Sequence, residues 1–305
     1  MQKYLKFFLK LVVSLGFVAW IILKTDWTQV LFYFKEISIW KLFVYIIFIL
    51  LGMLISAYKW KMLSEFKSIK YSLWDHFRFY QAGAFINNFM PSFIGGDTFR
   101  AYQTGKSEKK YIEAVSSVML DRITGFVGST ILVVLFGLLN IQKIIHINFL
   151  LLIDFLVLLS LLLFFLIIKY RKLAFWKNLS RFLPQKLVAL FAEMDEYNGD
   201  SRILGKTIWW GMIFGIVGVA IPNFILFWAL GIQIDLLDYL SVIFLISIIT
   251  AVPISINNIG VKEWAYVAFF GAFGANGAAM IAISVLSRFI QIFRGIRDSK
   301  ERDDK

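Results

Sequence analysis

Long runs of apolar residues, separated by short charged segments, fill most of this chain of 305 residues. Several of the runs reach the roughly 20 residues that a helix needs to cross a bilayer. The pattern therefore predicts an all-α, polytopic membrane protein. We expect about six transmembrane helices, at residues 7–23, 41–58, 115–139, 148–168, 207–230 and 265–287.

Two further apolar runs are too short to cross a bilayer. Phe77–Met90 and Tyr239–Val252 hold 14 residues each. As helices they would measure about 21 Å, against a hydrocarbon core of roughly 30 Å. Each run stops at a proline, and the polar stretches PSFIGGDTFR and PISINNIGVKE follow. The pattern predicts two re-entrant broken segments, over 76–100 and 239–262, that return to the side from which they start.

Lysine and arginine gather at both termini and in three loops. Cytoplasmic loops carry an excess of these residues, so we expect both termini in the cytoplasm. The two broken segments then start from opposite sides, as in transporters with an inverted repeat and a substrate site near the midplane. Ordinary kinked helices or surface loops are the alternative. The predicted cytoplasmic loops are 59–78, 100–113 and 169–206, and the predicted outer loops are 140–147 and 231–238.

Composition narrows the ligands that we expect. Hydrophobic residues make up 59% of the chain and the net charge is +12, with a mean hydropathy of +0.74. In so apolar a chain, basic loops are explained by membrane orientation and anionic lipid, so no nucleic-acid partner is expected. The chain has no cysteine, which excludes disulfides and thiolate metal sites. His76 and His146 lie far apart in the sequence, and we expect no metal and no cofactor.

We expect a single transmembrane domain, residues 1–296, and a charged cytoplasmic tail, residues 297–305. Within the domain, the charged segment 169–206 carries apolar residues at helical spacing. This spacing predicts an amphipathic helix on the membrane surface, with a solvated linker as the alternative. The apolar residues are Leu187, Leu190, Phe191 and Met194.

Five short motifs together resemble one known family. They are NNFMPSFIGGDTFR at 87–100, AVSSVMLDRITG at 114–125, PIS at 253–255, GVKE at 260–263 and SR at 287–288. Over about residues 5–296, the chain resembles the transmembrane region of lysylphosphatidylglycerol synthases and stand-alone flippase-like membrane proteins. Asn257 and Asn258 stand where that pattern often has a proline or a glycine, so we expect a different headgroup selectivity.

The resemblance implies a role in handling lipid in the inner (plasma) membrane of a bacterial-type cell. In that family the membrane region is credited with translocating aminoacylated phosphatidylglycerol, which a separate soluble domain synthesises. The 305 residues hold no such soluble domain, so lysyl transfer is not expected. We expect translocation of a phospholipid, an aminoacyl-phospholipid or a polyprenyl-phosphate carrier, and a separate lipid-modifying enzyme is a candidate partner. The alternative is a membrane glycosyltransferase, or an accessory protein of lipid-linked glycan synthesis, with an acidic cluster at Glu193, Asp195 and Glu196.

Charged residues within or beside the broken segments form the predicted site for an anionic lipid headgroup, because ionisable groups at membrane depth are costly and usually functional. Guanidinium and ammonium groups bind phosphate, and carboxylates can neutralise them when the site is empty. The alternative is that these residues are interfacial anchors and ion pairs. The cations are Arg100, Arg122, Lys262 and Arg288, and the carboxylates are Asp97, Asp121 and Glu263. The motifs add Asn88, Pro91, Gly95, Gly96, Pro253, Asn257 and Gly260, while Asp154 lies outside them and is a weaker candidate.

Overall fold

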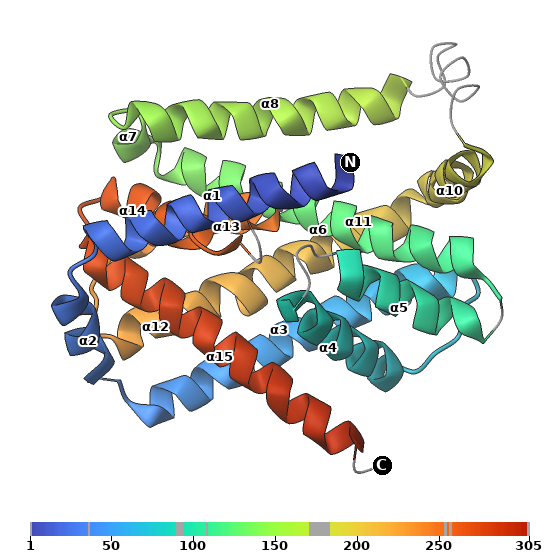
Figure 1. Cartoon of the computed structure of the whole chain (residues 1–305). Helices are drawn as coiled ribbons and strands as arrows, with labels where there is room; N and C mark the ends of the chain where they lie inside the picture. Colours follow the sequence, from blue (N-terminus) through green and yellow to red (C-terminus); the bar gives the residue numbers. More distant parts are fainter. Residues whose placement is uncertain are drawn as a thin grey trace.

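The computed structural model describes residues 2–35, 37–89, 94–107, 109–170, 184–252, 255 and 258–303, and the regular structure of these residues is entirely helical. The all-α prediction is therefore confirmed for the described residues (Figure 1). The helices in chain order are α1 (Gln2–Lys24), α2 (Trp27–Lys35), α3 (Ile39–Phe66), α4 (Leu73–Phe89), α5 (Ile94–Lys106), α6 (Tyr111–Leu139), α7 (Ile141–Ile144), α8 (Asn148–Tyr170), α10 (Gln185–Glu196), η1 (Tyr197–Gly199), α11 (Ser201–Phe214), η2 (Gly215–Ala220), α12 (Ile221–Ala229), α13 (Leu236–Ala251), α14 (Val261–Gly271) and α15 (Gly277–Asp303).

Three of the described helices are long and apolar enough to cross a membrane. They are α3, α6 and the continuous stretch α11–η2–α12, and they match three of the predicted spans. Helices α1 and α2 form a bent pair, with 83° between them, that can provide a fourth span. Helix α8 covers the predicted span 148–168. These helices support an integral membrane protein, while the number of six stays a prediction.

The predicted helix over 265–287 is wrong as a continuous element. Helix α14 ends at Gly271 and α15 begins at Gly277. Between them Gly274 has φ +82°, a left-handed conformation that favours glycine. Asn276 then caps α15 by accepting the backbone N–H of Ala278 at 2.8 Å. The local turn chemistry therefore ends one helix and starts the next within an apolar stretch.

The third long stretch contains a π-helical turn, η2, just before Pro222. Proline has no backbone N–H to donate to the preceding turn, and a wider turn accommodates that loss. The turn also lies close against α3, since a Cβ added at Gly52 would lie 2.4 Å from the Cα of Gly218. Only glycine at these positions permits this contact between helices.

Helices α4 and α5 form a hairpin that returns to the end where it starts. Tyr71, just before α4, donates to the carbonyl of Gln103 near the end of α5 at 3.2 Å. Lys110, just before α6, donates to the carbonyl of Ser68 at 3.2 Å. The hairpin therefore begins and ends beside the first residues of α6.

Helices α13 and α14 form a second hairpin at the other end of α6. The rings of Tyr239, at the start of α13, and Phe270, at the end of α14, are stacked with centroids 5.8 Å apart. Asn140, just after α6, donates to Asp238 in the first turn of α13 at 2.9 Å. The two hairpins thus begin at opposite ends of α6, and they lie on opposite sides of the molecule in Figure 1.

Loops that the charge pattern assigns to the same side of the membrane contact each other in the structure. Lys143 of the predicted outer loop 140–147 donates to Asp238 at 2.8 Å, and this hydrogen bond raises the pKa of the Lys143 ammonium. Lys67 pairs with Glu193 and Glu196 of α10, both at 2.6 Å. Helix α10 itself confirms the helix expected within 169–206. The assignment of each end to a membrane face stays a prediction.

Candidate functional site

The first hairpin buries a guanidinium between two carboxylates. Arg100 of α5 donates to Asp97, one turn earlier, at 2.8 Å and to Asp121 of α6 at 3.2 Å. Only 2% of Arg100 is exposed. The rings of Trp60 and Tyr80 lie 4.8 and 4.6 Å from its guanidinium carbon, measured to their centroids. Two carboxylates and two aromatic faces therefore offset the cost of burying this cation.

Two more cations complete what we call the charge cluster, defined as Lys59, Asp97, Arg100, Asp121 and Arg122. Lys59 of α3 lies 3.1 Å from Asp121 and also donates to its backbone carbonyl. Arg122 of α6 donates to both oxygens of Asp97, from Nε at 2.9 Å and from Nη2 at 3.0 Å. The ion pairs of the cluster join three cations to two carboxylates, which gives it a formal charge of +1.

Glycine allows the two helices of this hairpin to approach closely. A Cβ added at Gly96 would lie 2.1 Å from the carbonyl oxygen of Gly83. Asn87 of α4 accepts the backbone N–H of Gly96 at 2.8 Å and so satisfies one unpaired donor in the first turn of α5. The space beside Gly96, one of the predicted site residues, is therefore filled by α4. Gly95 lies in the same turn.

The second hairpin supplies the carboxylate of another ion pair, whose guanidinium comes from α15. Glu263, in the first turn of α14 and 3% exposed, accepts the backbone N–H of Gly260 at 2.7 Å. Arg288 of α15 donates to Glu263 at 3.1 Å and to the carbonyl of Asn258 at 3.2 Å. Gly260 has φ +82°, so glycine is favoured at this helix start. The pair thereby fixes both the turn before α14 and the position of α15.

Glu263→Gln is expected to lower the free energy of unfolding by about 1–2 kcal/mol. The amide keeps an oxygen for the N–H of Gly260, but it removes the charge that neutralises Arg288. Reversible unfolding in mixed micelles would measure the change. Glu65→Gln is the matched control, since Glu65 is half exposed in an i,i+4 pair with Lys61 and should change stability by less than about 0.5 kcal/mol. Equal effects of the two substitutions would contradict this role for Glu263.

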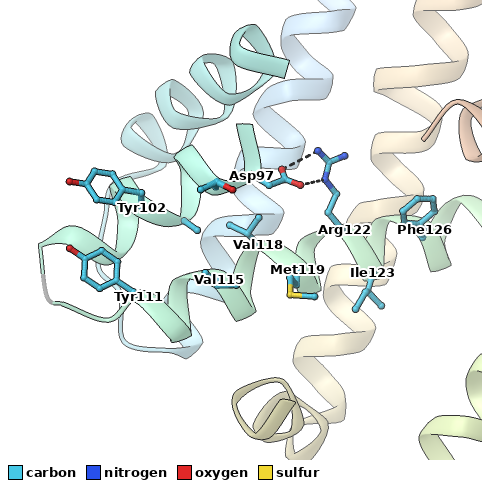
Figure 2. A pocket seen from close by; sticks show the side chains of 11 residues that line it. Asp97, Tyr102, Tyr111, Val115, Val118, Met119, Arg122, Ile123 and Phe126 are labelled. Carbon is cyan, nitrogen blue, oxygen red and sulfur yellow. Dashed lines mark hydrogen bonds and ion pairs between the residues drawn. The ribbon is translucent and has the colours of Figure 1, made fainter. Parts of the chain in front are cut away.

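A groove of about 630 Å³ lies between α5 and α6, beside the charge cluster (Figure 2). Asp97 and Arg122 line one part of it, and Tyr102 and Tyr111 line the other end, with their rings stacked 6.1 Å apart. The wall between and beyond these polar groups is apolar. Thr98 also lines the groove, and the apolar wall is formed by Ala101, Val115, Val118, Met119, Ile123 and Phe126.

The structure brings the predicted site residues together in two networks. One contains Asp97, Arg100, Asp121 and Arg122, and the other contains Gly260, Glu263 and Arg288. Lys262 does not repeat the Asp97–Arg100 pairing with its neighbour, because it donates to Ser287 while Glu263 pairs with Arg288. Helix α15 packs on α4 as well as on α14 and so connects the two hairpins. Pro91, Pro253, Asn257 and the side chain of Asn88 lie outside the described residues.

Lys59 is a site residue that sequence reasoning missed. The apolar run before it ends at residue 58, so the sequence pattern places Lys59 in the loop 59–78, but α3 continues to Phe66. A signal was present, because Ser56, Trp60 and Leu63 recur at the spacing of one helix face. All three are buried, and Lys59 lies beside them on that face.

The remaining acidic candidates lie outside these two ion-pair networks. Asp154 of α8 faces Gly137 of α6, where an added Cβ would lie 3.0 Å from its Oδ2, and its buried Oδ1 has no hydrogen-bond partner among the described residues. Glu193 and Glu196 of α10 both pair with Lys67, the residue that follows α3. Within the described ranges, no group of three His, Cys, Asp or Glu side chains is placed to hold a metal ion.

Comparison with known proteins agrees with the motif resemblance. The family model described as Lysylphosphatidylglycerol synthase TM region matches residues 7–296, and this match confirms the resemblance. No curated protein and no solved structure matches the chain. The match and the long apolar helices together identify an integral membrane protein.

Proposed function

Since the chain belongs to the lysylphosphatidylglycerol synthase TM region family, we propose that it carries membrane lipid between the two leaflets of a bilayer. The observation that supports this most is the pair of helix hairpins that begin at opposite ends of α6. Each hairpin contributes to a carboxylate–guanidinium pair: Asp97 and Arg100 pair within the first hairpin, and Glu263 of the second hairpin pairs with Arg288 of α15. In transporters with inverted repeats, such interrupted helices meet near the midplane and bind the substrate there.

The charges of the hairpins suit a lipid headgroup. Arginine binds phosphate oxygens through two parallel N–H donors, and a low-dielectric site strengthens that interaction. The carboxylates Asp97 and Glu263 keep the arginines neutralised when no lipid is present, which lowers the cost of the empty site. Rocking of the two hairpins about α6 would then open the site to one leaflet at a time.

A glycosyltransferase gains less support from the geometry. Such an enzyme needs carboxylates for acid–base or metal chemistry. Glu193 and Glu196, the acids closest to that requirement in the sequence, are both paired with Lys67. These two acids therefore stabilise the position of α10, and their ion pairs with Lys67 leave them less suited to sugar transfer.

Transport can be measured in liposomes that carry fluorescent phosphatidylglycerol in both leaflets. With the protein present, a membrane-impermeant quencher should remove the inner-leaflet signal that survives in protein-free liposomes. Arg122→Gln should slow this loss at least tenfold, because one bidentate contact to phosphate is removed. Arg78→Gln, which changes an exposed arginine on α4, is the matched control and should leave the rate unchanged.

The same liposomes distinguish the alternatives. If the protein moves no phosphatidylglycerol, aminoacyl-phosphatidylglycerol or polyprenyl phosphate, the proposed translocation is wrong. Formation of a glycosylated lipid from an added sugar donor would support the glycosyltransferase instead.

A further inference from the structure

The groove between α5 and α6 has the character of a site for one lipid molecule. Its wall on α6 consists of residues from Tyr111 to Phe126, which extend over about 22 Å of helix. Several wall residues are partly exposed, among them Met119 (39%) and Phe126 (38%). On a helix that is long and apolar enough to cross a membrane, an open apolar surface of this kind faces acyl chains.

Among the described residues that line the groove, Arg122 is the one cation that a ligand can reach. The side chain of Arg122 is 38% exposed, whereas those of Arg100 and Lys59 are 3% and 4% exposed. Figure 2 shows Arg122 extending from α6 toward Asp97 beside the apolar wall. An anionic group that enters the groove therefore meets the guanidinium of Arg122 first.

Asp97 occupies the donors that a phosphate would use. It accepts from both Nε and Nη2 of Arg122, and a phosphodiester offers two oxygens with the same spacing. Asp97 also accepts from Arg100 at 2.8 Å. If a phosphodiester replaced Asp97 on Arg122, the carboxylate would keep its second arginine and would not be left unpaired.

The charge of the cluster selects the headgroup. Three cations and two carboxylates leave a formal charge of +1, and a single phosphodiester carries one negative charge. A headgroup with an added ammonium would bring a further positive charge next to the cluster, where like charges repel at low dielectric.

We infer that the α5–α6 groove binds a phospholipid with one net negative charge, whose phosphodiester replaces Asp97 on Arg122 while an acyl chain lies along the apolar wall of α6. The inference rests on the proposed lipid-carrying function, and it assigns that function a substrate class. It predicts that phosphatidylglycerol binds more tightly than zwitterionic and aminoacylated phospholipids.

Photocrosslinking tests the site independently of transport. The full-length protein in phosphatidylcholine nanodiscs is mixed with phosphatidylglycerol that carries a diazirine on one acyl chain, and labelled peptides are mapped by mass spectrometry. Labelling is expected within residues 115–126 of α6. Unlabelled phosphatidylglycerol should compete best, followed by phosphatidylethanolamine and then by lysylphosphatidylglycerol. Glycerol phosphate at the same concentration should not compete, because it lacks the chain that the wall binds.

Two variants decide the outcome. Arg122→Gln should reduce labelling of α6 roughly tenfold, and Met119→Trp should reduce it by filling the groove while the charge cluster stays intact. Arg78→Gln should have no effect. Unchanged labelling in Met119→Trp, or stronger competition by lysylphosphatidylglycerol, would overturn the inference even if Arg122→Gln failed to fold. Specific labelling without lipid movement would support the binding site and show that the proposed translocation is wrong. Lipid movement that neither groove variant affects would support translocation and show that the proposed binding site is wrong.

Discussion

Asp121→Asn is expected to lower the free energy of unfolding by about 3–5 kcal/mol, the cost of breaking a buried ion pair on one side. Asp121 is 3% exposed and pairs with both Lys59 and Arg100, which are themselves buried. Asparagine fills the same volume without the charge. The formal charge of the cluster would rise from +1 to +2, and Lys59 would lose its charged partner while keeping the backbone carbonyl of residue 121.

The formal charge of the cluster also predicts which of two substitutions destabilises the protein more. Arg100→Gln lowers the formal charge of the cluster to zero and leaves Asp97 with Arg122 and Asp121 with Lys59. Its cost should therefore be smaller than that of Asp121→Asn, although Arg100 makes more contacts. Reversible unfolding in mixed micelles gives both values. A larger loss for Arg100→Gln would show that contacts rather than charge balance determine the stability of the cluster.

A second substitution should rescue the first. In the Asp121→Asn background, Lys59→Met removes the stranded ammonium and replaces it with an apolar side chain of similar length. Because a buried ion pair can be exchanged for apolar residues at little cost, the double variant should recover most of the lost stability. Additive losses would mean that Lys59 and Asp121 stabilise the protein independently.

The first helix of each hairpin could be predicted from the sequence because a local pattern determines where it ends. A run of 14 apolar residues cannot cross a bilayer as a helix, and a proline after it ends the helix. Helices α4 and α13 match the predicted runs within a few residues. The break between α14 and α15 also has a local cause in Gly274 and Asn276, but the apolar character of the flanking residues concealed it.

The ion-pair partners could be predicted only in part. Asp97 and Arg100 lie one helical turn apart, so their pairing follows from spacing. Adjacent residues on a helix do not face each other, which is why Lys262 and Glu263 have different partners. The partner of Glu263 is on another helix, and helix packing rather than sequence distance brings Arg288 to it.

Gly96→Ala is expected to cost about 3 kcal/mol or more, at the upper end of the range for inserting a methyl group into a packed site. The new Cβ would lie 2.1 Å from the carbonyl oxygen of Gly83 and 2.8 Å from Cγ of Asn87. The first of these is backbone and cannot rotate away, so α5 must move away from α4.

Gly205→Ala on α11 is the matched control for that substitution. No heavy atom lies within 4 Å of the position its Cβ would take, and alanine favours a helix by up to about 1 kcal/mol over glycine. The two glycine-to-alanine changes should therefore have opposite signs in the same unfolding experiment. Because Asp97 directly follows Gly96, movement of α5 would also separate Asp97 from Arg122, and Gly96→Ala should weaken lipid labelling of α6. Normal stability together with normal labelling would show that the hairpin does not need this close contact to form the charge cluster.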